Sequence, residues 1–565
     1  MRIINSGGTW PVKNRAATTR NSGAPLISLP LATTEPSMPA VTNSGYSYSG
    51  GSYAKKSMIG WDAVSSNADD DIVENLETLR RRSRSLFMGS PLATGALKTV
   101  RTNVVGSGLS LNARVDAKFL GLTDEQAQEW EAKTEREWRL WAESVNCDAE
   151  RRQNFYQLQS LVFLSALMSG DCFVVLPMLK RAGCPYQLCI GIIEADRVYD
   201  PPLKDGKKNI LGGIEVGTYG EAVAAYIWNR ARYAVPRSTD EALAKNQRVP
   251  FFGTHSGRRN LLHVMAEVER PAQRRGVPLL APVIEELKQL KRYTDAELMA
   301  AVISGFFTVF IKSNTPSELM DQFSAVPDGM RYDPDPSAIE LGNGAVCALG
   351  ENEDIVIADP KRPNTAFEAY VSAICRYIGA ALEIPYEILI KQFTASYSAS
   401  RAAQLEAWKT FRARRERLID AFCQPVYEEW LAEAVSSGRI AAPGFFSDPA
   451  VRAAWSGADW AGDSHGQLDP VKEVEAANLR IKYGLSTLTR EAAETTGMRF
   501  ETIVETRKRE IAKLKEAGVT IDSLPVPQAP IVESGSSKGA SEDEADQEDD
   551  SDLEDDSDLE EEENK

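Results

Sequence analysis

The sequence predicts a mainly helical α+β protein, and three observations support this fold class. Apolar residues recur at helical spacing over 281–305, over 365–383 and over 401–433. A strand-rich stretch with several turns, over 307–360, separates the first two of these helices. Between 172 and 265, short apolar runs alternate with turns, which is typical of an antiparallel sheet.

The N-terminal segment 1–60 is expected to be a flexible arm. It is rich in Ser, Thr, Gly, Asn and Pro, and its only acidic residue is Glu35. Such a composition offers too little apolar surface for a folded core. Order is expected from about Trp61, and a chain of 565 residues is long enough for more than one domain.

Helices are expected over 69–105, with a break at Gly89-Ser90-Pro91. The first of them carries an arginine quartet, which is either a solvated or ion-paired face or a contact to a subunit or DNA: Arg80, Arg81, Arg82 and Arg84. Thr123 and Gln126 form a capping box before a helix over 124–145. The tryptophans of that helix predict core packing and are Trp130, Trp138 and Trp141.

A second apolar helix is expected over 153–169, and strands follow it. The strand-like runs are CFVVLP, QLCIGII, GGIEVG, AVAAYIW and LLHVMAE. His263 lies in the last run and is interpreted as a hydrogen-bonded structural histidine. The next loop contains three arginines that either meet phosphate or pair with a neighbouring subunit: Arg270, Arg274 and Arg275.

In the second half of the chain, the helix over 365–383 stops at Ile384-Pro385. A polar loop over 391–400 follows, and the helix from Arg401 is expected to kink near Pro425. Residues 434–515 predict a mainly helical region, with helices over 470–484 and 489–516.

The negative charge of the chain lies almost entirely in its C-terminal tail. The formal net charge is −17, and residues 541–565 alone contribute −15. The other residues are therefore nearly neutral, which argues against a protein that grips DNA by broad electrostatics. Residues 517–565 are expected to be a disordered linker and tail, and the tail either repels DNA, recruits a basic partner or only aids solubility.

Signatures of catalysis and of cofactor or metal binding are missing from the sequence. GxxxxGK[ST] and HExxH do not occur, and GxSxG is not found in a strand-turn-helix setting. The seven cysteines form no CxxC pair and predict buried, reduced thiols. Asp463-Ser464-His465 are sequence neighbours, whereas catalytic triads join separate segments. Asp69-Asp70-Asp71 suits a helix dipole better than Mg²⁺. No apolar run reaches the ~20 residues of a membrane span, and no secretory signal is expected.

Several stretches, in order, resemble the lambda-like family of phage portal proteins. The first matching segments are GDCFVVLP, IEADRV and GGIEVGTYGEAVAAYIW. PAQRRGVPLLAPVIEELKQLKRYTDAELMAA and IPYEIL follow. The last are YSASRAAQLEAWKTFRARR and LDPVKEVEAANLRIKYGLSTL. The resemblance covers about 60–515.

This resemblance implies a portal fold with a wing, a long-helix stem, a small β-rich clip and a helical crown. The implied order is wing 61–277, stem helix 278–312, clip 313–362, second stem helix 363–388, channel loop 389–400, long wing or crown helix 401–433 and crown 434–516. It further implies a ring of twelve copies at a capsid vertex of the virion, made in the host cytoplasm. The partners implied are double-stranded DNA without sequence specificity, the terminase large subunit, head–tail connector proteins and the major capsid or scaffold protein.

Two groups of residues follow as candidate sites. The channel loop would meet DNA and comprises Lys391, Gln392, Phe393, Thr394, Ala395, Ser396, Tyr397 and Ser398. Phe393 and Tyr397 either buttress the loop or touch DNA. The second group makes either intersubunit ion pairs or internal DNA contacts: Arg412, Arg414, Arg415 and Arg417.

Other functions stay open at this stage. One alternative is a metal-dependent DNA-processing enzyme, and a second is a different head–tail adaptor ring, although such adaptors are usually shorter. A capsid-shell protein is a third. The leading interpretation is a DNA-conducting ring with no active site, cofactor or metal.

Overall fold

The computed structural model describes residues 56–58, 61, 66–201, 209–228, 246–305, 309–313, 353–357, 366–393, 396–463, 470–496 and 500–516. The chain divides into two units, Met1–Ser66 and Asn67–Lys565. Within the first unit, the described residues include one short turn of 3₁₀ helix, Lys56–Met58. The predicted arm and acidic tail lie outside the described residues. All elements below belong to the second unit.

Helices α1 (Ala68–Gly89) and α2 (Pro91–Val104) meet at one residue, Ser90. Its backbone N–H donates to the Leu86 carbonyl at 2.8 Å and closes α1. Its side chain accepts from the Ala93 N–H at 3.5 Å and caps α2. The predicted break is confirmed, because Pro91 stands in the first turn of α2 and cannot continue α1.

Helices α4 (Asp124–Ala142) and α5 (Phe155–Ser169) both begin with a capping box. The box of α4 is formed by Thr123 and Gln126, as predicted. Before α4 lie strand β1 (Ser110–Ala113) and the short helix α3 (Ala117–Leu120). β1 pairs antiparallel with β11 (Ala458–Ala461), a pairing that the sequence did not predict, because each strand has only four residues.

The strands after α5 form two antiparallel sheets. One has the order β3-β2-β8, with β2 at Asp171–Val175, β3 at Gly191–Glu194 and β8 at Leu261–Met265. The other has the order β4-β5-β6-β7. Its strands are β4 (Asn209–Leu211), β5 (Ile214–Val216), β6 (Ala222–Trp228) and β7 (Asn246–Pro250). The five predicted runs contain β2, β3, β5, β6 and β8, whereas β4 and β7 were not predicted.

The main core is built around Trp138 of α4. Its ring meets Trp141, Phe155, Tyr427 and Trp430 at centroid distances between 4.9 and 5.7 Å. The interpretation of the tryptophans as core packing is therefore confirmed, although Trp130 lies at the edge of this core and packs on Trp455. The described cysteines are also free and buried or half-buried.

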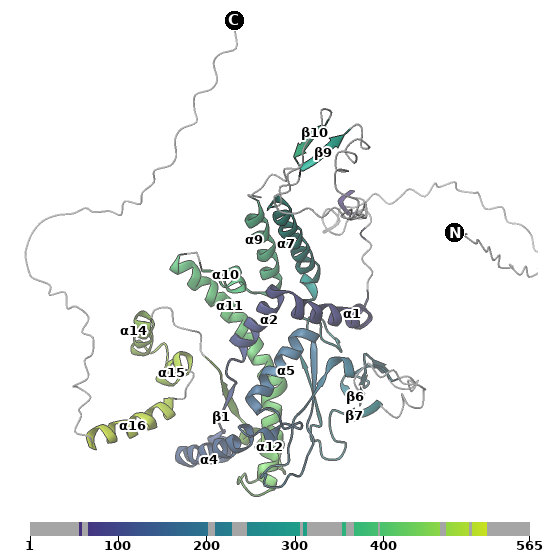
Figure 1. Ribbon diagram of the computed structural model, residues 1–565. Coiled ribbons are helices and arrows are strands. Elements are labelled where there is room, and N and C mark those ends of the chain that lie inside the picture. The colour runs from purple at the N-terminus through teal and green to yellow at the C-terminus, as the bar shows by residue number, and fades with distance from the viewer. Residues whose placement is uncertain are drawn as a thin grey trace, which may run out of the picture. The chain divides into compact units, whose positions relative to one another are not determined.

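The long helices of the second half occupy the predicted positions. α7 (Ile284–Gly305) follows a 3₁₀ turn at Ala281–Val283 and packs beside α9 (Phe367–Leu382), as Figure 1 shows. Tyr293 of α7 stacks on Phe367 of α9 with ring centroids 5.6 Å apart. Between the two helices in sequence, β9 (Val309–Ser313) and β10 (Glu353–Ile357) pair antiparallel. The predicted turns of this insert lie outside the described residues.

The helix expected from Arg401 begins four residues earlier. α11 spans Tyr397–Leu418 because the Ser396 side chain caps it, so the last part of the predicted loop is helical. A π-helical turn at Ile419–Cys423 leads into α12 (Gln424–Ser436). The predicted kink near Pro425 stays a prediction. The π turn lies directly before this proline, which offers no N–H to the preceding turn. Before the loop, YEILI forms α10 (Tyr386–Ile390).

The C-terminal region contains α13 (Pro449–Trp455), α14 (Pro470–Lys482), α15 (Leu488–Thr496) and α16 (Phe500–Glu516). The prediction of one helix over 489–516 is wrong, because α15 and α16 are separate. Gly497, a poor helix former, lies between them in sequence. Among the described residues, every helix falls short of the length and apolar character that crossing a membrane requires.

Candidate functional site

Helix α7, which was predicted to be the first stem helix, has two halves in different environments. Leu287 and Leu290 near its start are buried in the main core. Further along the same helix, Leu298 and Met299 are 63% and 61% exposed, and Val302 is also exposed. The helical apolar repeat in the sequence therefore continues beyond the point where this chain covers it.

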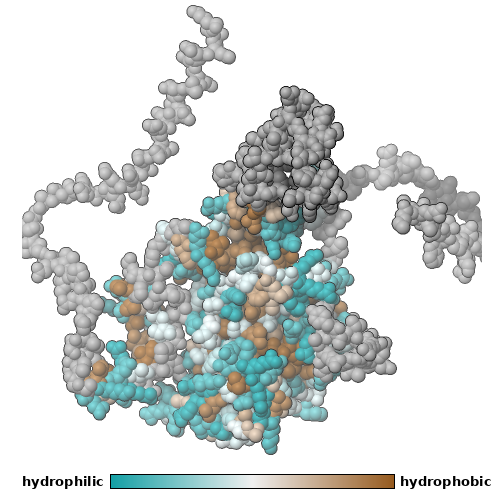
Figure 2. Space-filling view, in the orientation of Figure 1, coloured by the Kyte–Doolittle hydropathy of each residue, from teal (hydrophilic) through white to brown (hydrophobic). Residues whose placement is uncertain are grey.

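Helix α9 is divided between two faces along its length. Cys375, Ile378 and Leu382 are buried, whereas Tyr370 is 49% and Tyr377 74% exposed. Figure 2 shows apolar surface over this pair of helices. We call the exposed apolar side chains of α7 and α9 the stem surface, and they are Leu298, Met299, Val302, Tyr370 and Tyr377.

A tight turn fixes the start of the channel loop after α9. Glu383 adopts a left-handed conformation with φ of 57°, and the Ile384 N–H donates to the Gly379 carbonyl at 2.9 Å. A Cβ atom at Gly379 would lie 2.6 Å from the Ile384 carbonyl oxygen, so only glycine fits this approach. Ile384 and Leu389 are then buried, which anchors α10 on the body.

The loop itself leaves α10 at Lys391, which also has a left-handed conformation, with φ of 59°. The Gln392 N–H donates to the Glu387 carbonyl at 3.1 Å. Phe393 is 54% exposed, so within one chain it does not buttress the loop. Ser396 and Ser398 are exposed, and their hydroxyl oxygens lie 3.2 Å apart.

The remaining loop residues are described in part. Tyr397 is the first residue of α11, which corrects its assignment to a loop. Thr394 and Ala395 lie outside the described residues. The exposed part of the predicted channel loop is therefore Lys391–Phe393 with Ser396 and Ser398.

The structure brings Lys98 of α2 close to Lys391. Both line a pocket of about 400 Å³ with the turn between α1 and α2, and both side chains are exposed. Lys291 of α7 borders the same turn, because its ammonium donates to the Gly89 carbonyl at 3.4 Å. The sequence could not indicate this grouping, since α2 and the loop are far apart in the chain.

The arginine group of α11 does not form one surface. Arg414 is buried, and its guanidinium faces Glu267 at 3.0 Å and Glu383 at 3.4 Å. The prediction of a subunit or DNA contact is therefore wrong for Arg414, whose counter-ions belong to its own chain.

Arg415 is also engaged within the chain. It donates to the Asn103 and Val104 carbonyls at the end of α2 and to the Asp463 carbonyl. Its guanidinium also lies over the Trp408 ring. This structural role corrects the surface prediction for Arg415. Arg412 and Arg417 are exposed, and their role in intersubunit ion pairs or DNA contacts stays a prediction.

A buried ion-pair network joins α1, β2 and β8 to the loop that precedes α7. Asp171 at the start of β2 is fully buried and accepts from Arg80 of α1 at 2.7 Å. Arg275 approaches the same carboxylate with two nitrogens, at 2.7 and 3.0 Å. The Gly276 N–H and the His263 ring complete the set at 3.0 and 3.2 Å.

Ion pairs at this network show what two sequence motifs do: the arginines of the loop 270–275 and the acidic run 69–71. Arg270, Arg274 and Arg275 pair with Asp71, Asp69 and Asp171. Arg275 is buried in the network, so it meets neither phosphate nor a neighbouring subunit. For Arg270, which is exposed, either contact stays a prediction. The same pairs engage two members of the Asp69-Asp70-Asp71 run.

The arginine quartet of α1 divides between buried and surface positions. Arg80 pairs with Asp171, and Arg84 pairs with Asp196. Arg81 pairs with Glu77 at the surface, and Arg82 is exposed. The ion-paired interpretation is therefore confirmed for Arg80, Arg81 and Arg84.

Charge interactions set the protonation of this network. Burial alone would raise the pKa of Asp171, but Arg275, Arg80 and the His263 hydrogen bond hold the pKa of that carboxyl well below its usual range. Burial lowers the pKa of His263, and Asp171 only partly opposes it. His263 is thus a neutral, hydrogen-bonded structural residue, as predicted. Its ring also stacks on Phe173.

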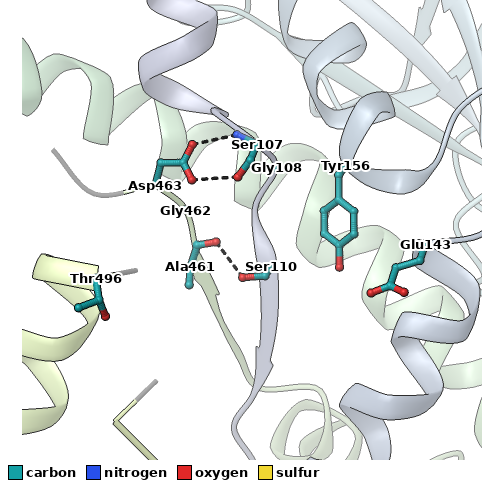
Figure 3. A pocket seen from close by; sticks show the side chains of 9 residues that line it. All are labelled: Ser107, Gly108, Ser110, Glu143, Tyr156, Ala461, Gly462, Asp463 and Thr496. Atoms are coloured by element: carbon teal, nitrogen blue, oxygen red, sulfur yellow. Dashed lines mark hydrogen bonds between the residues drawn. The ribbon is translucent and has the colours of Figure 1, made fainter. Parts of the chain in front are cut away.

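Asp463 lies in a separate pocket of about 510 Å³ beside the β1–β11 pair (Figure 3). Its two carboxylate oxygens accept from the Ser107 N–H and hydroxyl, each at 2.9 Å. This carboxylate therefore ties two loops together. Ser464 and His465 lie outside the described residues. Among the residues the structure describes, no three His, Cys, Asp or Glu side chains gather as a metal site would require.

Comparison with known proteins decides the family. Residues 54–415 match the model of the family described as phage portal protein, lambda family.

The chain belongs to the lambda family of phage portal proteins.

Among curated relatives, Portal protein B of Escherichia phage lambda is 23% identical over 89% of this chain and 95% of its own length. The portal protein of Escherichia phage N15 is 23% identical over 88% of this chain and 95% of its own length. A chain from the neck of an empty gene transfer agent particle is 13% identical, with a TM-score of 0.43 over 74% of this chain and 92% of that chain. As a phage portal protein, the chain is a virion component of a structural rather than enzymatic family.

Proposed function

We propose that this portal protein assembles into a closed ring of twelve copies at one capsid vertex, and that double-stranded DNA passes through its centre during packaging and ejection. The observation that carries the proposal is the stem surface. Its five apolar side chains lie on two helices that also carry side chains buried in the body. A surface held rigidly in this way suits a repeated contact between copies.

The energetics favour covering this surface. Fully burying one large apolar side chain is worth about 1.5–3 kcal/mol. A neighbour related by rotation offers a different face of the same helices, so that one head-to-tail contact repeats until the ring closes. We propose that α7 and α9 form the stem of the ring in this manner.

Contact with DNA would then fall to the channel loop. Lys391 and Lys98 supply exposed ammonium groups, and Ser396 and Ser398 supply small polar ones. Cations that meet only phosphates carry no sequence information, which a channel for any genome needs. Because only two lysines of each copy take part, the contact stays weak and sensitive to salt.

The outer parts of the ring would meet the other components of the particle. We assign 313–362 to the clip, which would face first the terminase large subunit and later the head–tail connector proteins. Residues 434–516 would form the crown inside the shell, and the wing would contact the major capsid or scaffold protein. Assembly would take place in the host cytoplasm, and no catalytic step is assigned to the chain.

Negative-stain microscopy of the purified full chain tests the ring. We expect annular particles for the wild type and single copies for the double variant Leu298→Ser with Val302→Ser. The matched control is Asp295→Asn, which changes an exposed polar residue of the same helix and should assemble normally. Circular dichroism should give the same helix content for all three proteins. Rings of the double variant at wild-type yield would overturn the assignment of the stem surface.

Replacement of the loop tests the channel. Exchanging residues 391–395 for Gly and Ser, together with Lys98→Gln, removes both lysines and keeps the Ser396 cap of α11, so the ring should still assemble. Packaging or retention of DNA should fall in these particles. Wild-type packaging by rings with the exchanged loop would remove the channel assignment.

A further inference from the structure

The last described helix, α16, ends in a strongly basic segment. Between Arg507 and Lys515 the sequence is RKREIAKLK, with five cations and one acid, Glu510. All five cationic side chains are exposed: Arg507, Lys508, Arg509, Lys513 and Lys515. We call residues 507–515 the basic segment, and its formal charge is +4.

Acids along α16 offset part of this charge. Glu505, Glu510 and Glu516 lie three or four residues from cations of the segment, and residues 505–516 together still carry a formal charge of +2. Arg509 and Lys513 are four residues apart, so they lie on neighbouring turns where like charges repel. A helix end of this kind attracts a polyanion, and the attraction grows as the salt concentration falls.

The chain itself carries a polyanion close to this segment. Residues 541–565 hold a net charge of −15 and begin 25 residues after Glu516. At 3.3–3.6 Å for each residue, such a linker spans at most about 90 Å. The acidic tail can therefore reach the basic segment of its own copy or of a neighbouring copy. Covalent linkage raises the local concentration of the tail to the order of millimolar.

We propose that the acidic tail 541–565 binds the basic segment of α16 and keeps DNA off it. The occupant follows from charge complementarity and from the short linker, since each copy of the chain brings its own tail. Without the tail, the basic segment would hold DNA phosphates by sequence-independent attraction. The tail would thus limit friction on DNA at α16. This inference goes beyond the proposed function and needs no ring, so the two can fail separately.

Binding of a random-sequence 30-base-pair DNA duplex tests the proposal. The proteins compared are the full chain and a chain that ends at residue 540, and the readout is fluorescence anisotropy at two salt concentrations. We expect truncation to tighten binding about fivefold or more at 50 mM salt and much less at 200 mM, because both contacts are electrostatic. Equal affinity of the two chains at 50 mM salt would overturn the proposal.

A charge variant separates binding of the tail to α16 from general repulsion of DNA. In a chain that carries Lys508→Gln, Lys513→Gln and Lys515→Gln, removal of the tail should change the DNA affinity little, because the surface that tail and DNA share is gone. The same fivefold gain in that background would show that the tail does not act through α16 and would overturn the proposal. Added peptide 541–565 should compete with DNA on the truncated chain. The peptide with Asn and Gln in place of its acids should not compete.

Microscopy of the same samples keeps the two proposals distinguishable. Ring formation depends on the stem surface, so both truncated and full chains should assemble alike. Loss of rings in every sample would count against the proposed function, while the comparison of affinities would still decide the role of the tail.

Discussion

The buried network at Asp171 and the stem surface on α7 differ in how the chain meets an energetic cost. The carboxylate of Asp171 is a buried charge, which is unfavourable by itself. Ion pairs with Arg80 and Arg275 and a hydrogen bond with His263 stabilise it within the same chain. On the outer half of α7 the cost is exposed apolar area, and nothing described in the chain covers Leu298. The comparison shows that one copy of the chain balances the charges around Asp171, whereas it leaves the apolar side chains of the stem surface exposed. This exposure fits the proposed contact between copies.

Removing the central acid of the network should have the largest effect. Asp171→Ala leaves two buried guanidinium groups without their shared counter-ion, and breaking a buried pair in this way costs about 3–5 kcal/mol. Urea unfolding should therefore show a much lower free energy of unfolding. The control is Asp459→Ala, whose ion pair with Arg114 is exposed and should contribute little. Equal losses in the two variants would contradict a network that stabilises the wing.

Two leucines of α7 give the second comparison. Leu287 is 1% exposed, so Leu287→Ala should lower the free energy of unfolding by about 2–5 kcal/mol through the cavity that it leaves. Leu298→Ala should leave the free energy of unfolding of single copies nearly unchanged but weaken assembly. Unfolding at low protein concentration, together with sedimentation, separates the two effects. A stability loss of similar size at Leu298 would mean that the chain itself covers this residue.

Acid should weaken the wing through His263. Burial lowers the pKa of His263 in the folded state, so the unfolded chain binds a proton at a higher pH than the folded chain does. Stability should therefore fall as the pH drops below the ordinary histidine value of about 6.5. His263→Gln should flatten this dependence between about pH 5 and 7, as measured by urea unfolding. A slope that persists in the variant would assign the effect to another group.

The free energy of unfolding should fall further at lower pH, and protonation of Asp171 contributes to this second decline. Its pKa is lower in the folded state, so its contribution is present above the ordinary aspartate value of about 3.9 and is lost as the pH falls below it. His263→Gln should leave this second decline in place.

The smallest effect is expected at the channel loop. Lys391→Gly removes an ammonium group at a position with positive φ, where glycine is favoured, so the fold should not weaken. Combined with Lys98→Gln, it should lower the salt slope of DNA binding by about one for each phosphate that the protein no longer neutralises. An unchanged slope would separate these lysines from DNA.

Local signals in the sequence located most elements. The Ser90-Pro91 break, the capping box at Thr123 and the stop at Ile384-Pro385 act within one helical turn, so they could be recognised without a structure. The loop boundary was missed because Tyr397 and the serines around it are weak helix formers, and tertiary context decided the start of α11.

Contacts between distant segments could not be predicted. Arg275 meets Arg80 and Asp171 only after the sheet and α1 have packed together, and no local spacing indicates this. Arg414 and Arg415 looked like surface cations in a basic run, yet their acceptors lie far away in sequence. Lys98 was missed at the candidate site for the same reason.

The most direct test of the central claim is the accessibility of the stem surface in single copies and in assembled rings. A single cysteine in place of Leu298 can be labelled with a maleimide under both conditions, with the native chain as background. The control is a cysteine in place of Arg82, which is exposed on α1. We predict fast labelling of position 298 in single copies and strong protection in rings, with position 82 reactive in both. Equally fast labelling of position 298 in rings would contradict a stem surface covered by neighbouring copies.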